Sequence, residues 1–509
     1  MTTPARPVPP PPARLVARRA AIDTYQQPVI YMRSDCPVCR AEGFEAQAQV
    51  EVAANGRHVL AILHRVEAGW LGHDEAALSD AAWALLDLAG GEPVTVRHAP
   101  PIESLAYLRA KVYGRELSYA ELRALIDDVS RGHLSDLHLA SFVTACAGGG
   151  LSSREVVDLT RAMVDVGERL AWPVSPVMDK HCVGGLPGNR TTPIVVPIVA
   201  ACGVVMPKTS SRSITSPAGT ADAMETLAPV ELTVAQMRRV VEREGGCIAW
   251  GGAVALSPAD DVLIRVERPL DLDSEAQLVA SVLSKKLAVG AERVVIDIPV
   301  GPTAKVRSAE AARSLAASLH AVGAALGLAL RIVETDGRQP VGRGIGPALE
   351  AHDVLAVLQG AAHAPPDLRE RALALAAEVL EMAGRCETGA GAALARETLA
   401  SGRAWAKFVA ICQAQGGLRE PPVARHASVV VAPAAGTVAA IDNRRLARAA
   451  KLAGAPRDAA AGVTIHVRLG DVVAAGQPLF TLHADAPGEL DYALGYAHAQ
   501  PAPIVGLES

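Results

Sequence analysis

Aromatic residues are scarce in this chain: Phe, Trp and Tyr together make up 3% of its 509 residues. Proteins that bind single-stranded nucleic acid stack the bases on several aromatic side chains, and this chain offers few. A basic excess is also missing, because 49 Lys and Arg stand against 54 Asp and Glu, a formal net charge of −5. Both absences argue against a dedicated nucleic-acid-binding protein.

Cysteine and long apolar runs are also lacking. Eight cysteines are too few for a disulfide scaffold and predict a reduced, cytoplasmic protein. The one close pair, Cys36 and Cys39, is followed by no second pair at ligand spacing, so we expect ordinary thiols and no metal site. The most apolar stretch, from Pro193 to Pro207, is shorter than the roughly 20 residues of a membrane-spanning helix. We therefore expect no membrane contact.

What the chain does contain is apolar material for several domains, since half of its residues are hydrophobic. Residues 1–27 are rich in proline and predict a flexible tail. Residues 28–100 hold short apolar runs between turn residues and predict a small N-terminal α+β domain. Residues 101–175 show helical periodicity and predict a helical domain, in which Ser152 and Glu155 begin one helix.

Residues 176–415 alternate between helical patterns and buried strands, which predicts a central α/β domain around a parallel sheet. The apolar run Ile194–Ala201 fits either a buried helix or a strand. Residues 423–509 read as strands and resemble the barrel-sandwich shape of biotinyl and lipoyl carriers, a second α+β domain. A carrier needs a lysine at a hairpin tip, whereas Lys451 lies in a predicted helix, so we expect a structural role. The fold class is α/β overall.

Two polar segments point to an anion site. Asp179–Thr192 reads DKHCVGGLPGNRTT, in which glycines let backbone amides approach an anion and Lys180 supplies a compact positive charge. The order of a P-loop is absent. The segment 208–220 reads KTSSRSITSPAGT, whose hydroxyls suit phosphate or sugar. The alternative for each segment is a polar turn without a ligand.

These two segments and ASVLSKKLAVGAERVVIDIPVG, residues 280–301, resemble the signatures of the thymidine and pyrimidine nucleoside phosphorylase family. The resemblance covers the chain from about Ile102 to its end. It is closer to a longer branch that contains archaeal AMP phosphorylases and bacterial relatives labelled "putative thymidine phosphorylase", which also carries an extra N-terminal domain.

The resemblance implies a pentosyltransferase in which phosphate attacks C1′ of a nucleoside and releases the base and a pentose 1-phosphate. It implies small-molecule substrates, inorganic phosphate as co-substrate, no cofactor and no nucleic acid. Family members dimerise through their helical domains, so we expect a homodimer or a larger homo-oligomer. Leu139, Phe142 and Val143 are candidates for the dimer face.

The residues that match the family's site fall into three groups. The phosphate contacts are Lys180, Gly185, Thr192, Ser210 and Thr220. The nucleoside or nucleotide contacts are Ser211, Arg212, Ser213, Ile214, Thr215, Ser216, Ser281, Lys285 and Lys305. The catalytic candidates are His181, at the base or sugar, and Asp273, which matches a proton donor of the AMP branch. We expect Lys286, beside Lys285, on a solvated helix face, and a helix cap is the alternative for Asp273.

The sequence allows two alternatives for the base that the enzyme releases, a pyrimidine or adenine. Pyrimidine phosphorylases hold the base with an Arg, and Asp260 stands at the matching position here. We expect a thymidine-phosphorylase-type enzyme, with an AMP phosphorylase that yields adenine and ribose 1,5-bisphosphate as the alternative. Two other classes stay open. A phosphoribosyltransferase of related fold would need Mg²⁺-binding carboxylates such as Asp260 and Asp261, and a carrier module would need a modified lysine.

Overall fold

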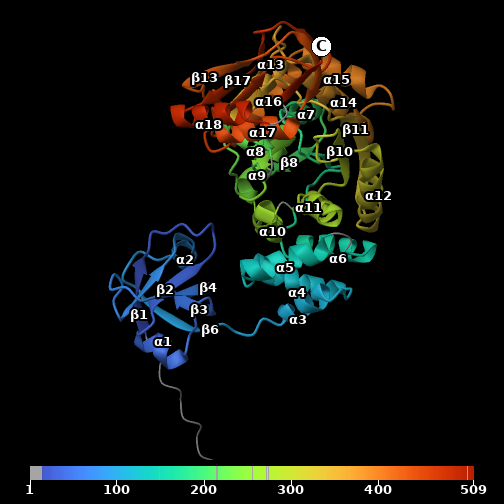
Figure 1. Cartoon of the computed structure of the whole chain (residues 1–509). Helices are drawn as coiled ribbons and strands as arrows, with labels where there is room; N and C mark the ends of the chain where they lie inside the picture. Colours follow the sequence, from blue (N-terminus) through green and yellow to red (C-terminus); the bar gives the residue numbers. More distant parts are fainter. Residues whose placement is uncertain are drawn as a thin grey trace, which may run out of the picture. The chain divides into compact units, whose positions relative to one another are not determined.

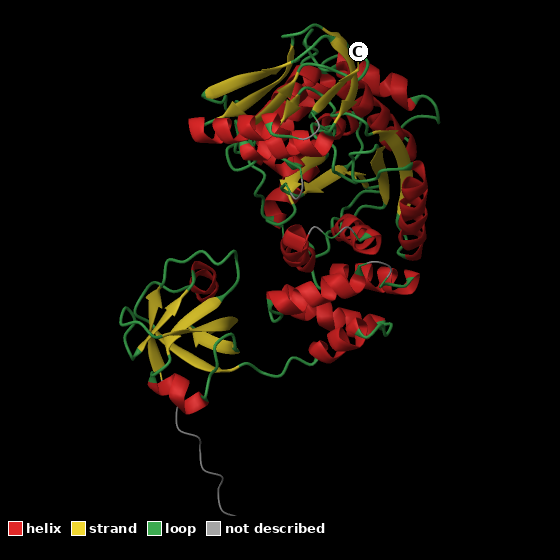
Figure 2. Ribbon diagram, in the orientation of Figure 1, coloured by secondary structure: helices red, strands yellow, loops and turns green. Residues whose placement is uncertain are grey.

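The computed structural model describes residues 14–147, 150–213, 216–254, 256–270, 272, 274–500 and 503–508. The chain divides into two units: one runs to Val112 and includes Asp128–Phe142, and the other comprises Tyr113–Asp127 and the chain from Val143 onward. Figure 1 follows both units along the sequence, and Figure 2 separates their helices from their strands.

The first unit contains a closed barrel of six strands in the order β1-β5-β2-β4-β3-β6 (Figure 2). Their bounds are β1 Arg14–Arg19, β2 Val29–Arg33, β3 Gln49–Ala54, β4 Arg57–Val66, β5 Glu75–Leu78 and β6 Pro93–His98, and the short helices are α1 Pro37–Glu42 and α2 Asp80–Leu86. Alternate residues of a strand face opposite sides of a sheet, so Val50, Val52 and Ala54 of β3 are buried together.

The predicted flexible tail over residues 1–27 is wrong for Arg14–Arg19. This segment is strand β1, which pairs in parallel with β5 and antiparallel with β6. Leu15 and Ala17 alternate with exposed residues and are buried in the barrel. The alternation is only two apolar residues long and follows a run of prolines, so composition concealed it. Residues 1–13 lie outside the described part.

The paired cysteines are packing residues of the barrel. Cys36 caps α1, its Sγ accepting a hydrogen bond from the Cys39 N–H at 3.2 Å. Both side chains are buried, and burial raises the pKa of the Cys39 thiol. Among the described residues, no group of three or more His, Cys, Asp or Glu is arranged to hold a metal ion.

Four helices follow the barrel: α3 Ser104–Val112, α4 Tyr119–Ser130, α5 Asp136–Cys146 and α6 Ser153–Asp165. Ser152 and Glu155 form the predicted capping box of α6. Leu139, Phe142 and Val143, the candidates for a dimer face, have no exposed surface within the chain. Packing within the chain therefore uses these residues, and the expected dimer stays a prediction that needs another face.

The second unit contains a parallel sheet in the order β11-β10-β7, which bears out the predicted α/β character. Its strands are β7 Met178–Cys182, β10 Arg293–Val300 and β11 Ala329–Asp336. A second parallel pair consists of β8 Met206–Ser210 and β9 Gly246–Trp250. The helices are α7 Thr192–Ala201, α8 Thr220–Glu225, α9 Val234–Glu244, α10 Pro258–Leu270, α11 Glu275–Ala288, α12 Ala309–Ala325, α13 Pro347–Leu358, α14 Pro366–Met382, α15 Gly391–Ala400 and α16 Arg403–Gln415.

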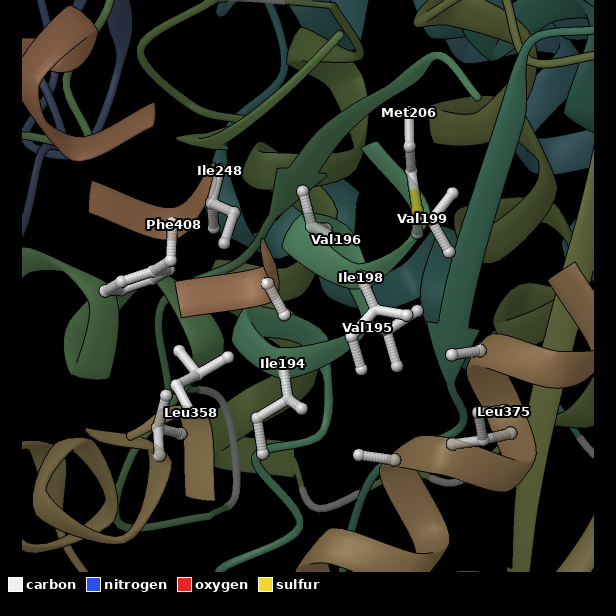
Figure 3. Close-up of a cluster of buried hydrophobic side chains, with 14 of the residues drawn as sticks. Ile194, Val195, Val196, Ile198, Val199, Met206, Ile248, Leu358, Leu375 and Phe408 are labelled. Carbon is white, nitrogen blue, oxygen red and sulfur yellow. The ribbon is translucent and has the colours of Figure 1, made fainter. Parts of the chain in front are cut away.

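Helix α7 forms the centre of this unit's core and settles the open assignment of Ile194–Ala201 as a helix. A helix that is apolar on all sides has to be buried on all sides, and α7 from Thr192 to Ala200 is. Figure 3 shows its side chains between Phe408 of α16, Leu375 of α14 and Ile248 of β9. The core that anchors the end of β8 and the start of α7 is thus built from aliphatic residues with very few aromatic ones.

The C-terminal part forms two sheets, β12-β15-β17-β13 and β16-β14-β18. The elements are β12 Gly344–Ile345, β13 His426–Val431, β14 Gly436–Ile441, α17 Asn443–Leu452, β15 Gly462–Ile465, β16 Val472–Val473, β17 Pro478–Ala484, α18 Pro487–His498 and β18 Val505–Glu508. Strand β12 comes from the central α/β segment, so this segment and the C-terminal part share a sheet. Lys451 lies on α17, as predicted, and not on a hairpin. No helix in the described part of the chain is long and apolar enough to cross a membrane.

Because Phe408 is fully buried against α7, we expect Phe408→Ala to lower the free energy of unfolding of this unit by about 3–5 kcal/mol. Urea denaturation followed by circular dichroism measures the loss. The matched control is Val472→Ala, whose side chain is 80% exposed, and it should change the value by less than about 0.5 kcal/mol. Equal effects of the two variants would contradict the assigned core.

Candidate active site

A cavity of about 210 Å³ lies where strands β7 and β8 end. Ligands of open α/β sheets bind at the carboxyl ends of the strands, so this is the expected place for a site. The walls come from the glycine-rich segment after β7, the hydroxyl-rich segment after β8, one face of α11, and Lys305. The structure brings together these predicted residues: Lys180, His181, Gly185, Thr192, Ser210, Ser211, Arg212, Ser216, Thr220, Ser281, Lys285 and Lys305.

Four predicted residues are not among the cavity walls. Ser213 donates its hydroxyl to the Ser216 carbonyl and its N–H to Asp222 at 2.6 Å, so it stabilises the loop instead of facing the cavity. Ile214, Thr215 and Asp273 lie outside the described residues. The proton-donor interpretation of Asp273 therefore stays a prediction from sequence.

Lys180 is the central cation of the glycine-rich wall. Strand β7 carries it, it has no exposed surface, and its Nζ donates to Thr191 Oγ1 at 2.6 Å. Burial lowers the pKa of Lys180. An ammonium has three N–H donors, so donation to Thr191 leaves others for a ligand.

Glycine is required in this wall because two segments meet there without room for a side chain. Gly185 has φ +77°, and a Cβ added to it would lie 2.8 Å from Cβ of Lys305. The turn after β7 therefore packs directly on the loop that carries Lys305. This contact fixes the distance between the glycine-rich segment and Lys305.

The hydroxyl-rich wall contains a buried hydroxyl that has no hydrogen-bond partner among the described residues. This hydroxyl is Oγ of Ser210, at the end of β8. Unpaired buried polar atoms are rare and need a partner such as a ligand or water. Ser210 Oγ is thus free to donate to an anion in the cavity.

Arg190 organises the same wall, a role that the sequence analysis did not assign. Its Nη1 donates to Thr220 Oγ1 at 2.9 Å, its Nη2 to the Ala218 carbonyl at 2.9 Å, and its Nε lies 2.5 Å from Glu350 of α13. Because the Thr220 oxygen accepts from Arg190, its own hydroxyl proton is left to donate elsewhere. Arg190 therefore orients Thr220 toward a ligand.

The expectation that Lys286 lies on a solvated face is wrong. Lys286 is 1% exposed and its Nζ donates to Asp179 Oδ2 at 2.7 Å. Lys208 lies on the other side of the same carboxylate, with Nζ 3.2 Å from Asp179 Oδ1. Burial lowers the pKa of Lys286 to about 7. The error arose because α11 is buried on several faces, which helical spacing from Lys285 alone does not reveal.

His181 stands among these lysines. Burial, followed by the charges of Lys286, Lys208 and Lys285, lowers its pKa well below the ordinary value. The imidazole is therefore neutral at pH 7. It can donate or accept a hydrogen bond there, but it does not carry a spare proton.

Ser281 and Lys285 lie one turn apart on the face of α11 that lines the cavity, as their spacing predicted. Lys285 Nζ donates to Ser281 Oγ at 3.4 Å and lies 2.5 Å from Asp260 Oδ2 of α10. Burial acts to lower the pKa of Lys285, but the Asp260 carboxylate outweighs it and the pKa is raised. Asp260, which stands in place of the family's Arg, is 1% exposed and acts on Lys285 instead of lining the cavity.

Three family models match the chain in order. Residues 105–167 match the helical bundle domain of a glycosyl transferase family, residues 174–405 match its a/b domain, and residues 437–501 match the pyrimidine nucleoside phosphorylase C-terminal domain. These matches include the glycine-rich segment, the hydroxyl-rich segment and α11.

Similar proteins agree with these matches. "Putative thymidine phosphorylase 2" of Acidovorax sp. (strain JS42) is 65% identical over 96% of this chain and 95% of the relative. "Putative thymidine phosphorylase" of Polaromonas sp. (strain JS666) is 64% identical over 98% of this chain and 97% of the relative. The crystal structure of anthranilate phosphoribosyltransferase from Thermus thermophilus shares the fold, with a TM-score of 0.50 at 21% identity over 60% of this chain and 98% of that chain. The chain therefore belongs to the pyrimidine nucleoside phosphorylase family.

Proposed function

We propose that this pentosyltransferase catalyses the reversible phosphorolysis of thymidine to thymine and 2-deoxy-α-D-ribose 1-phosphate. The observation that supports it is the charge of the cavity. Lys180, Lys208 and Lys286 are buried in its wall, and a single carboxylate, Asp179, lies within ion-pair distance of two of them. Buried charges need partners, so this wall favours an anionic ligand, and the phosphate dianion is the nucleophile of the family's reaction.

The phosphate would lie between the two polar segments. Lys180 offers the compact positive charge, and Ser210 and Thr220 offer hydroxyl donors that no other described residue accepts from. Thr192, at the start of α7, adds the N-terminus of a buried helix, which favours an anion. Each of these contacts is charge-assisted, so together they hold the nucleophile in place.

In the reaction, a phosphate oxygen forms the bond to C1′ while the bond from C1′ to N1 of thymine breaks. The bonding electrons leave with the base, and positive charge spreads over C1′ and the ring oxygen. Catalysis is then mainly positioning of phosphate and stabilisation of the departing base. Lys285 and Ser281 are donors suited to the carbonyl oxygens of thymine, and the neutral His181 supplies a further hydrogen bond near the reacting centre.

The choice of thymidine follows the names of the relatives, which do not favour the AMP alternative. Asp260 removes the second cation that pyrimidine phosphorylases aim at the base. Its ion pair with Lys285 keeps that lysine charged and in place. We infer that base recognition depends mainly on Lys285 and Ser281.

A substrate panel tests this function directly. With inorganic phosphate as co-substrate, we expect kcat/KM for thymidine to exceed that for AMP, uridine monophosphate and cytidine monophosphate by at least about tenfold, the discrimination that one unsatisfied buried polar group gives. Release of the base is followed by chromatography. A preference for any nucleoside monophosphate would sink the thymidine proposal and return attention to Asp273.

Loss of the central cation should weaken phosphate binding. Lys180→Ala removes a charge-assisted contact worth about 1.5–3 kcal/mol, so we expect the phosphate KM to rise by roughly 10- to 150-fold. Lys407→Ala is the matched control, since Lys407 pairs with Glu244 and is not among the cavity walls. Unchanged phosphate kinetics in Lys180→Ala would show that the glycine-rich segment is structural.

Lys286 should link phosphate binding to pH. Its pKa of about 7 leaves it partly neutral at pH 7.5, and a bound anion favours its charged form, so binding should take up a proton there. Calorimetry in buffers of different ionisation enthalpy counts that proton. Lys286→Met retains Lys208 beside Asp179 and should take up fewer protons on binding phosphate. Identical proton uptake in the two proteins would refute this role of Lys286.

A further inference from the structure

A buried side chain of the C-terminal part contacts one loop of the active site. Asn443 is the first residue of α17 and has no exposed surface. Its backbone N–H and its Nδ2 donate to Thr303 Oγ1, at 3.1 and 3.0 Å, and its Nδ2 also donates to the Gly337 carbonyl at 3.0 Å. The first N–H groups of a helix have no partner within the helix, and here one of them is used on the central segment.

Thr303 lies in the loop that carries Lys305. This loop, residues 301–305, follows β10 and is closed by hydrogen bonds from the Gly301 N–H to the Val306 carbonyl and from the Ala304 N–H to the Gly301 carbonyl, both 3.0 Å. Asn443 thus holds this loop from the start of α17. The threonine oxygen accepts two bonds at once, so its position is fixed by α17.

The same loop leads directly into the cavity. Lys305 lines the cavity. Gly185 of the glycine-rich segment packs against it so closely that a Cβ added to Gly185 would lie 2.8 Å from the Cβ of Lys305. Gly301 packs even more closely against the next loop, since a Cβ there would fall 2.3 Å from the Gly337 carbonyl oxygen. A shift of the loop would therefore displace both Lys305 and Gly185.

The surroundings explain why the C-terminal part can act as a fixed support. Strand β12 of the central segment pairs with β15, so the two segments share one sheet, and Arg468 donates to the Pro340 carbonyl at 3.4 Å. Figure 1 shows the C-terminal elements in orange and red, with α17 among them. Within the C-terminal part, Asn443 contacts the loop that carries Lys305, a predicted ligand-binding residue.

We propose that Asn443 is a positioning residue of the active site, which acts through Thr303 to hold Lys305 and the adjoining Gly185 turn in their binding arrangement. This inference rests on the proposed function for its kinetic test. It gives the C-terminal domain a part in substrate binding that neither a carrier role nor a purely structural role includes.

Two variants weaken the contact from opposite sides. Asn443→Ala deletes the side-chain donor and leaves only the bond from the backbone N–H of residue 443 to Thr303. Thr303→Val deletes the acceptor of both bonds while keeping the shape of the threonine. Lys305→Ala first identifies which substrate, thymidine or phosphate, depends on Lys305, because its KM rises in that variant. We expect Asn443→Ala and Thr303→Val each to raise the KM of that same substrate by about tenfold and to change kcat less than twofold. The control is Arg444→Ala, an exposed neighbour on the same helix, which should match the wild type.

A double-mutant cycle separates positioning from general destabilisation. In the Lys305→Ala background, Asn443→Ala and Thr303→Val should each lower kcat/KM by a smaller factor than in the wild type, because the ammonium group that the loop positions is gone. Additive losses, or normal kinetics in both single variants, would overturn the proposal. The kinetics use thymidine and inorganic phosphate with the full chain.

Hydrogen–deuterium exchange gives a readout that does not need activity. In Asn443→Ala and Thr303→Val, exchange should increase in residues 301–305, with the barrel of the first unit unchanged. If the wild type turns over no thymidine, the proposed function is refuted. The exchange result alone then decides whether Asn443 restrains the loop. Unchanged exchange in that loop would refute the restraint itself.

Discussion

The site depends on an unequal count of buried charges. Asp179 is the carboxylate between Lys208 and Lys286. Lys180 is buried in the same wall, where the charge of the buried Asp297 favours its ammonium form but no carboxylate of the described residues is in hydrogen-bond contact with it. Three buried lysines thus face two buried carboxylates. Burying an ammonium is costly unless an anion is near, so the free energy of this arrangement improves when a dianion enters. Burial and the charges of these lysines together hold the pKa of His181 well below its ordinary value. The buried lysines thus bear both on the proposed phosphate binding and on the hydrogen-bonding state of the histidine.

The rest of the second unit holds these charges in place. Strand β7 carries Asp179, Lys180 and His181 in consecutive positions, and β8 carries Lys208 and Ser210 beside it. Helix α7, buried on all sides, anchors the segment between them. Arg190, which lines the cavity and pairs with Glu350 of α13, holds the hydroxyl-rich segment. Asn443, which lies outside the cavity in the C-terminal part, holds the loop of Lys305. The specificity of the site is therefore distributed over segments far apart in the sequence.

Sequence alone predicted the parts of this picture that are written in short segments. The glycine-rich turn, the hydroxyl-rich segment and the Ser281–Lys285 spacing all led to residues that meet in one cavity. It failed for Lys286, whose burial depends on what packs around α11, and for Arg14–Arg19, whose strand character comes from pairing with β5 and β6. Arg190 and Asn443 were missed for a related reason: Glu350, a partner of Arg190, lies 160 residues away in the chain, and Thr303, a partner of Asn443, lies 140 residues away. No local pattern encodes such contacts.

The roles of individual site residues are still predictions, and one measurement tests their common basis. A crystal structure of the protein soaked with inorganic phosphate shows where the anion binds. We predict phosphate between the two polar segments, within hydrogen-bond distance of Lys180 Nζ and of the Ser210 hydroxyl, which has no partner among the described residues. An empty cavity at saturating phosphate, or phosphate bound with Ser210 still unpaired, would contradict it.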